Sequence, residues 1–269
     1  MQFDTEDKMK VKEITEKLAK DYPPQLACAW DNPGLQVGHA DREVKKIIVA
    51  LDATDSVINT CIKKGAQLLV THHPLLMSGL KQINDSGYLG RKVLALAEHG
   101  VAHYAMHTNY DVTQMAQLAR EQLHLSDTEV LEETATLEDG TVCGIGSVGK
   151  LPRKMTAREC CAYVKESFGL SNVRLFGEPE VTIERLAVSP GSGKSMITPA
   201  LQKGAQLLVT GDIGHHDGID AVDQGLLVID AGHYGVEKIF IRQMAEYLSA
   251  SFPQIKVETA ETGEPFAVL

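Results

Sequence analysis

The chain has 269 residues, of which 43% are hydrophobic and 23% charged, a balance typical of a globular protein with a buried core. Its formal net charge is −10 and its basic residues form no block, which argues against nucleic acid or an anionic membrane as a partner. No apolar run approaches the roughly 18 residues of a membrane-spanning helix. The N-terminus is polar and the five cysteines form no CxxC motif, so we expect reduced thiols in a cytoplasmic protein.

The first half of the chain alternates expected helices and strands. Apolar residues at helical spacing begin near Met9, so we expect residues 1–8 to be an extension outside the fold and the first helix to span 11–20. A turn rich in Pro and Gly follows around Trp30. Strands are expected at 47–51, 67–70 and 101–106, with helices at about 55–64 and 88–98. This alternation predicts an α/β fold with mainly parallel strands.

The second half repeats this order after a middle segment that does not follow it. The middle segment, 131–182, predicts strands at 142–148 and 173–176 around a helix that begins at the Thr156–Glu159 capping box and ends near 168. We expect it to pack lobes or subunits together. Strands at 183–188, 206–209 and 226–229 follow, with a helix at 219–224 and a C-terminal helix that ends near 251.

One octapeptide, KGAQLLVT, occurs both at 64–71 and at 203–210. Eight consecutive identities at one offset, about half of the chain, indicate an internal duplication. Each copy contains a glycine that ends a helix and a short apolar run that begins a strand. We therefore predict two similar α/β lobes, 1–130 and 131–269, with a metal site between them at the carboxyl ends of the strands.

Six of the ten histidines follow the carboxyl ends of expected strands, where open α/β sheets bind ligands. They are His72, His73, His107, His215, His216 and His233. His72 and His73 are neighbours, so on an extended chain their rings point to opposite sides, which suits two metal ions better than one. His233 and Glu237 are four residues apart at an expected helix start and should share one face. Asp111 adds a further carboxylate.

These residues predict a dinuclear metal centre with the ligands His72, His73, Asp111, His233 and Glu237. Imidazole-rich sites favour zinc, iron, manganese, cobalt or nickel over magnesium or calcium. Two ions joined by a bridging carboxylate can activate a water molecule for attack on a small substrate.

Three histidines are candidates for catalysis. His107 is expected either to act as a general acid or base, or only to orient the Asp111 loop. We expect at least one of His215 and His216 to face the metal site as a proton shuttle or substrate contact. The segment 191–195 lacks the first glycine of a Walker A motif, so it predicts a tight turn or, at most, a phosphate-binding backbone.

Several motifs resemble those of the Ngg-one-interacting-factor-three-like (NIF-three-like) family, whose bacterial members are called GTP cyclohydrolase 1 type 2 homologues. They are His72-His73-Pro74, His107-Thr108-Asn109-x-Asp111, Asp230-x-Gly232-His233-x-x-x-Glu237, Trp30-Asp31-Asn32-x-Gly34 and Gly211-Asp212. The resemblance implies two similar α/β lobes, a toroidal homohexamer and a dinuclear divalent-metal centre on the five ligands predicted above. The chain is too short for the large domain inserted in some members.

The sequence thus predicts a metal-dependent, hydrolase-like protein that acts on a small molecule. The family name suggests GTP, opened at the imidazole ring of the purine with loss of formate. Two alternatives stay open: a dinuclear phosphoesterase or nucleotidase, and a non-catalytic metal-binding scaffold or regulatory protein. Release of formate, of inorganic phosphate or of neither product would separate the three.

Overall fold

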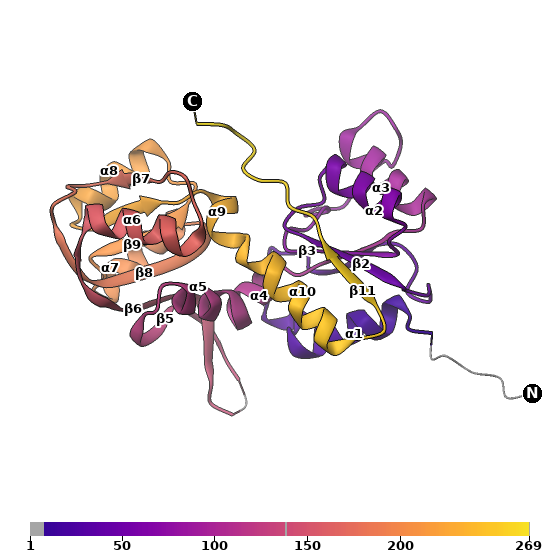
Figure 1. Cartoon of the computed structure of the whole chain (residues 1–269), viewed down its shortest axis with the longest axis horizontal. Helices are drawn as coiled ribbons and strands as arrows, with labels where there is room; N and C mark the ends of the chain where they lie inside the picture. The colour runs from indigo at the N-terminus through magenta and orange to yellow at the C-terminus, as the bar shows by residue number, and fades with distance from the viewer. Residues whose placement is uncertain (1–7, 138, 269) are drawn as a thin grey trace, which may run out of the picture. The chain divides into compact units, whose positions relative to one another are not determined.

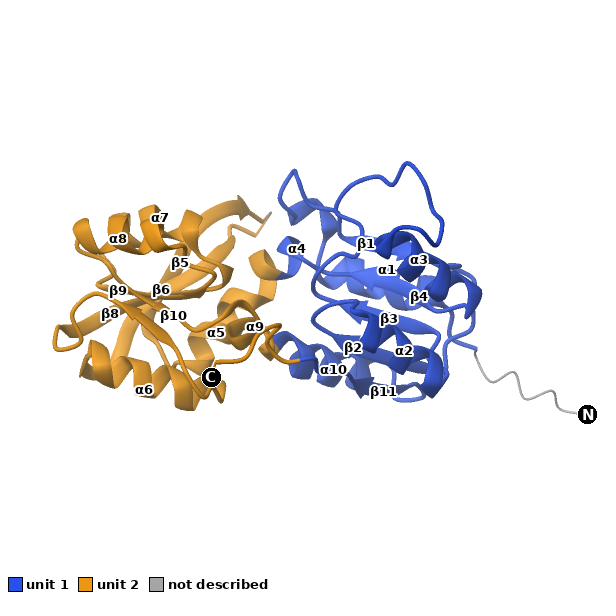
Figure 2. Ribbon diagram, turned by 90° about the horizontal axis from the view of Figure 1, so that it is seen from above, with its two compact units in different colours: residues 1–110, 240–262 blue, residues 111–239, 263–269 orange. Residues whose placement is uncertain are grey.

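The structure, a computed structural model, describes residues 8–137 and 139–268, so nearly all of the expected N-terminal extension lies outside the described residues. The chain divides into two compact units, one formed by the chain up to residue 110 with 240–262 and the other by 111–239 with the segment from 263 onward (Figure 2). The lobes predicted from the sequence repeat, 1–130 and 131–269, stay a prediction. No helix among the described residues has the length and apolarity needed to cross a membrane.

The first unit contains a five-stranded sheet of order β1-β4-β3-β2-β11, in which only β1 is antiparallel to its neighbour (Figure 1). Its strands are β1 (Gly34–Val37), β2 (Lys46–Ala50), β3 (Leu68–Thr71), β4 (Ala102–Ala105) and β11 (Lys256–Thr259). Its helical segments are α1 (Val11–Asp21), η1 (Pro24–Leu26), α2 (Asp55–Lys64), α3 (Tyr88–Glu98), α4 (Thr108–Tyr110) and, beyond its first residue, α10 (Ile239–Ser251).

The second unit contains a six-stranded sheet of order β5-β6-β8-β9-β10-β7. Its strands are β5 (Ser126–Thr136), β6 (Val142–Thr156), β7 (Arg174–Phe176), β8 (Thr182–Ser192), β9 (Leu207–Gly211) and β10 (Leu227–Asp230). Only β8, β9 and β10 pair in parallel; the other three pairings are antiparallel. Its helical segments are η2 (Asp111–Met115), α5 (Ala116–Gln122), α6 (Ala157–Phe168), η3 (Lys194–Met196), α7 (Ile197–Gln202), α8 (His215–Asp223) and α9 (His233–Glu237).

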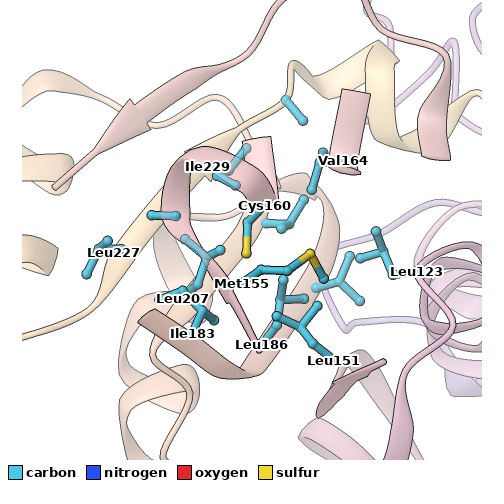
Figure 3. Packing of buried hydrophobic residues seen from close by; sticks show 14 of the residues in the cluster. Leu123, Leu151, Met155, Cys160, Val164, Ile183, Leu186, Leu207, Leu227 and Ile229 are labelled. Atoms are coloured by element: carbon cyan, nitrogen blue, oxygen red, sulfur yellow. The ribbon is translucent and has the colours of Figure 1, made fainter. Parts of the chain in front are cut away.

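The chain is therefore a mixed α/β protein, as predicted, with its cores on the faces of the two sheets. Every residue of β3 is buried. Parallel sheets are covered on both faces, which explains why this strand is a largely apolar run. In the second unit, Leu207 of β9 and Ile229 of β10 pack with Cys160 of α6 (Figure 3). Burial of this kind contributes about 25 cal/mol per Å² of apolar surface and is the main source of stability in each unit.

The two copies of the octapeptide form the same local structure, each within its own unit. Gly65 and Gly204 both adopt left-handed backbone, with φ of 63° and 69°, as the predicted helix endings require. The side-chain oxygen of Gln67 accepts hydrogen bonds from the N–H groups of 45 and 46, and that of Gln206 accepts them from 184 and 185. The two copies thus share their local hydrogen bonds as well as their sequence.

Most expected elements are present within a few residues of their predicted bounds, and the unexpected ones include three edge strands and the helical segments α4, η2 and α5. β1, β5 and β11 were not expected, because edge strands are short or polar and carry little apolar periodicity. β6 extends to Thr156 instead of 148 because it pairs with both β5 and β8. α8 begins at His215, earlier than the predicted 219. The expectation of mainly parallel strands holds for the first sheet only.

Candidate metal centre

The first cluster of candidate ligands follows β3 and β4 in the first unit. His72 and His73 come directly after β3, and His107 follows β4, the next strand of the sheet. The ring centroids of His72 and His73 lie 5.0 Å apart. The ring centroid of His107 lies 5.3 Å from that of His72 and 5.6 Å from that of His73. One nitrogen of each ring lies within 4.8 Å of the others, so the three side chains could hold a metal ion.

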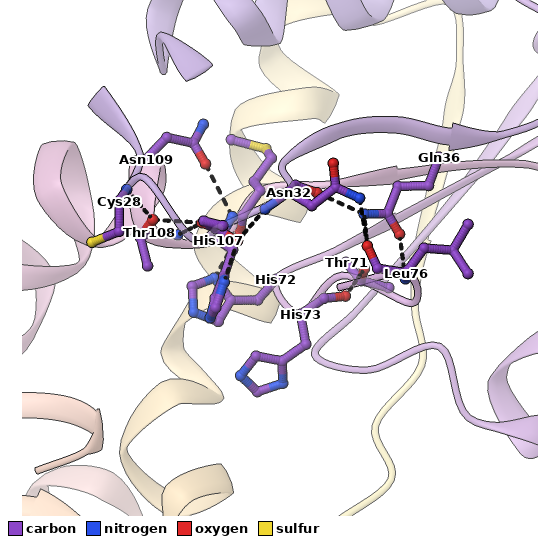
Figure 4. Close-up of polar contacts among 12 residues, drawn as sticks. Cys28, Asn32, Gln36, Thr71, His72, His73, Leu76, His107, Thr108 and Asn109 are labelled. Carbon is purple, nitrogen blue, oxygen red and sulfur yellow. Dashed lines mark hydrogen bonds and ion pairs between the residues drawn. The ribbon is translucent and has the colours of Figure 1, made fainter. Parts of the chain in front are cut away.

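The convergence of the two neighbouring rings corrects the expectation that they point to opposite sides. That expectation assumed extended backbone, whereas His72 and His73 lie in a bend just beyond the strand end. The Thr71 hydroxyl stabilises this bend by donating to the carbonyl oxygen of His73 at 2.7 Å. Figure 4 shows the resulting cluster of rings.

Each histidine of this cluster is held through its Nδ1 atom. Nδ1 of His72 lies 2.8 Å from the carbonyl oxygen of Met106, and Nδ1 of His73 lies 2.8 Å from a carboxylate oxygen of Asp52. Nδ1 of His107 makes a third such bond, 2.8 Å from Asp31 Oδ1. A carbonyl or carboxylate oxygen can only accept, so Nδ1 carries the hydrogen and Nε2 of the neutral ring carries the lone pair. The rings therefore present Nε2 as the ligand atom.

Asp31, which the sequence analysis placed in a turn and in a family-like motif, contacts His107, a partner that no sequence pattern indicated. Its side chain is fully buried, and it also accepts a hydrogen bond from the N–H of Thr108 at 2.9 Å. Burial alone would raise the pKa of this carboxyl, but the bonds from His107 and Thr108 outweigh it and hold the pKa at about 2. Asp31 is thus a permanent negative charge behind the His107 ring.

The second cluster lies in the second unit, where β10 ends. His233 and Glu237 are the first and last residues of α9, and His233 Nε2 lies 3.0 Å from Glu237 Oε2, so they share a face as their spacing predicts. Two atoms each about 2.1 Å from one ion, at a right angle, lie about 3 Å apart, so this pair fits a common metal ion. His233 Nδ1 lies 2.7 Å from Asp212 Oδ2, which repeats the histidine–carboxylate arrangement of the first unit.

A glycine that the sequence did not single out as a site residue completes this cluster. Gly191 has a φ of +85°, and a Cβ placed on it would lie 2.5 Å from Glu237 Oε1 and 3.9 Å from His233 Nε2. The backbone of β8 thus closes directly on the carboxylate. Lys194, in the segment 191–195, forms an ion pair with Asp217 at 2.9 Å, and the predicted binding of phosphate by this segment stays a prediction.

The other predicted site residues lie in different settings. Asp111 is partly buried and opens η2, a π-helical turn of the kind often found at functional sites. His215 and His216 form the first turn of α8, where both are exposed and their ring centroids lie 5.2 Å apart. Their predicted part in catalysis stays a prediction.

The site thus belongs to the class of histidine–carboxylate arrangements that suit transition metals, on a mixed α/β fold. A family model described as Duf34/NIF3 (NGG1p interacting factor 3) matches residues 9–265. The chain is 35% identical to the "GTP cyclohydrolase 1 type 2 homolog" of Lactococcus lactis over 96% of this chain and 99% of that protein. A protein of the same name from Clostridium perfringens is 32% identical, over 85% and 87%. The chain belongs to the Duf34/NIF3 family.

Solved structures agree with this assignment. "Reduced HcgD" from Methanocaldococcus jannaschii superimposes with a TM-score of 0.81 at 32% identity, covering 93% of this chain and 97% of that chain. A Bacillus cereus protein related to NIF3 gives a TM-score of 0.90 at 24% identity, covering 97% and 99%, which establishes the likeness of fold alone.

Proposed function

We propose that this protein is a metal-dependent hydrolase in which His72, His73, Asp111, His233 and Glu237 hold two divalent ions. Nitrogen and carboxylate donors of this kind suit zinc, iron, manganese, cobalt or nickel. Five protein ligands leave positions in two coordination shells for water or substrate, as catalytic sites require. Those positions are the chemical basis for proposing an enzyme rather than a closed structural site.

The hydrogen bonds at Nδ1 carry this proposal. His73 and His233 each donate through Nδ1 to a carboxylate, and His72 donates to a backbone carbonyl. Such a bond fixes the ring, sets its tautomer and raises the basicity of Nε2. Metal-bound histidines usually make a bond of this kind, to a carboxylate or carbonyl acceptor, through their other nitrogen.

The bound ions would lower the pKa of a water molecule and polarise the bond under attack. His107 is the residue we propose as the general acid or base, because it lies beside His72 and His73 and its Nδ1 donates to Asp31. Its Nε2 can accept a proton from the attacking group and return it to the leaving group. Asp31, ionised at neutral pH, would stabilise the imidazolium that forms.

The substrate we propose is a nucleotide, with GTP as the first to test. The names of the curated relatives support this choice, and the reaction would open the purine imidazole ring and release formate.

We also propose that the protein is a cytoplasmic homohexamer. The five cysteines form no disulfide, which supports the compartment but not the assembly. A monomer in sedimentation at micromolar concentration would contradict the assembly.

The test begins with elemental analysis of untagged protein purified without added metal. About two ions per chain are expected, with loss of metal in Glu237→Ala and none lost in Glu246→Ala, a change at an exposed carboxylate on α10. The loaded protein is then incubated with GTP, and formate and phosphate are both measured, with Asp111→Ala as the inactive comparison.

Formate released by the wild type and lost in Asp111→Ala supports the proposed reaction. Phosphate in its place would make the protein a phosphoesterase, and full metal content with neither product would make it a scaffold. Failure to bind metal, also after reconstitution, would refute the ligand assignment itself.

A further inference from the structure

A cavity of about 540 Å³ lies within the second unit, beside His233 and Glu237. It opens where β10 ends, and residues from the start of β7 and from the C-terminal segment line it, among them Arg174, Asp230 and Phe266. Its volume falls within the range of sites that bind small molecules. Neither the proposed metal ligands nor the proposed proton carrier lines it, so the function proposed above leaves it without a role.

The charges on the cavity wall select against phosphate. Three carboxylates, Asp212, Asp230 and Glu264, line the cavity together with a single guanidinium, that of Arg174. Asp230 is almost fully buried and forms an ion pair with Arg174, so this positive charge is already neutralised. Asp230 also accepts hydrogen bonds from the N–H groups of Ile213 and Gly232, at 2.9 and 3.0 Å. The remaining acidic wall favours a ligand that donates hydrogen bonds.

Glu264 is placed to receive such donors. A Cβ built on Gly232 would lie 2.5 Å from Glu264 Oε1, so the C-terminal segment rests its carboxylate directly against the start of α9. Burial, together with the nearby charges of Asp212 and Asp230, raises the pKa of Glu264. Donors from a bound ligand would stabilise its ionised form.

The cavity also offers an apolar face. The Phe266 ring lines it and is 59% exposed, so a ligand in the cavity can reach its face. A planar heterocycle placed against an aromatic ring gains stacking energy, largely whichever base it is. The cavity therefore combines a flat apolar contact with acceptors at its edge.

We propose that this cavity binds a planar heterocycle with adjacent N–H donors, the class that includes guanine, with Phe266 against its face and Glu264 accepting at its edge. Asp212 lines the cavity and accepts a hydrogen bond from His233, a proposed metal ligand. Asp212 would therefore lie between the bound ring and that ligand. The inference rests on the proposed function, because it assigns the base-recognition part of that nucleotide site. The phosphates would then lie outside the acidic cavity.

The experiment uses nucleosides, which lack phosphate and so report on the cavity apart from the metal ions. Calorimetric titration of the metal-loaded protein should show guanosine binding roughly tenfold more tightly than inosine, which lacks the 2-amino donor. Phe266→Ala should weaken guanosine binding roughly tenfold. Glu264→Gln should abolish the preference for guanosine over inosine.

Two matched variants serve as controls. Glu261→Gln changes a carboxylate of the same C-terminal segment outside the cavity wall, and Tyr88→Ala removes an exposed aromatic ring in the first unit; both should bind guanosine like the wild type. Equal binding of guanosine and adenosine, a preference retained in Glu264→Gln, or no nucleoside binding by fully metal-loaded protein would overturn the proposal. Loss of metal in the wild type would instead count against the proposed function, so the two failures are distinct.

Discussion

A histidine ring is a selective metal ligand only when one of its nitrogens is held and the other is directed outward. Here the same solution recurs in both units: Asp52 holds His73, and Asp212 holds His233. In each case the carboxylate follows one strand and the histidine follows the parallel strand beside it, β2 with β3 and β9 with β10. Parallel strands bring their carboxyl ends to the same edge, so the pairing is a consequence of the sheet itself.

The residue types at these strand ends could be read from the sequence, but their partners could not. His72, His73, His233 and Glu237 follow recognisable apolar runs, which is why they were predicted as a group. The bond between Asp31 and His107 spans 76 positions and joins a turn to a strand end, so no local pattern encodes it. Asp52 and Asp212 could be paired with their histidines only once the order of the strands is known.

Asp52→Asn tests whether the held nitrogen matters for metal binding. An amide accepts a weaker hydrogen bond than a carboxylate, so His73 Nε2 becomes less basic and a weaker ligand for the metal ion. We expect metal affinity to fall about 10- to 100-fold with little change in fold. Competition with a metal-sensitive dye measures the affinity, and Asp85→Asn, in an exposed loop, is the control. Unchanged affinity would show that the Asp52 bond only stabilises the loop.

His103 provides a pH-dependent prediction that can be measured on metal-free protein. It is fully buried in β4, and burial lowers its pKa to about 3. Its Nε2 donates to the Thr71 hydroxyl at 2.8 Å, because that hydroxyl itself donates to His73. Below about pH 6.5 the His103 ring is protonated in the unfolded chain but stays neutral in the native protein. The stability from His103 is therefore complete above pH 6.5 and is lost as pH falls toward 3, at about 1.4 kcal/mol per unit.

The measurement is urea unfolding of metal-free protein at pH 6.5 and pH 5. Between these values the wild type should lose about 2 kcal/mol more than His103→Gln, whatever the variant's stability at neutral pH. All other histidines are common to both proteins, so the difference isolates this residue. Parallel losses in the two proteins would mean that His103 is protonated in the native state.

At the scale of the elements, glycines mark the positions where backbone must approach a functional group or turn sharply. Gly65 and Gly204 were predicted correctly as helix endings, because a glycine between a helical pattern and an apolar run has a local signature. Gly191 has no such signature, since its need for a hydrogen side chain comes from Glu237, 46 positions further on. The edge strands β1, β5 and β11 were missed for the related reason that their pairing partners, not their own residues, define them.

Gly191→Ala and Gly204→Ala separate these two roles. Both glycines have positive φ, so either change strains the backbone and should cost about 1 kcal/mol of stability. Only the Cβ at 191 meets the Glu237 carboxylate, while the one at 204 meets nothing within 4 Å. We expect Gly191→Ala alone to lose metal, by elemental analysis. Equal metal content in both variants would contradict the contact between β8 and Glu237.

At the scale of the whole molecule, the compact units do not follow the order of the chain. The sequence repeat suggests a single division, but the chain returns after residue 239 to give α10 and β11 to the first unit (Figure 2). β11 pairs in parallel with β2, although about 200 positions separate them. Such a closing strand cannot be predicted from local periodicity, because KVET is as polar as a loop.

The closing strand should be essential to stability and the last residues should not. Two truncated chains, ending after Ile255 and after Thr262, differ only in β11 and the three residues beyond it. Without β11, the N–H and C=O groups of β2 become an unpaired edge beside Ile47 and Ile48, both fully buried in the intact protein. We expect the shorter chain to lose several degrees in Tm and to aggregate, and the longer one to melt close to the full chain.

Thermal unfolding followed by circular dichroism measures both truncations. The longer one also removes Glu264 and Phe266, so it should stay folded while losing the binding of guanosine proposed for the cavity. This outcome would place β11 in the fold and the final segment in ligand recognition. If both truncations melt equally early, loss of the last seven residues accounts for the whole destabilisation, so the expectation for β11 is wrong and the final segment is part of the fold.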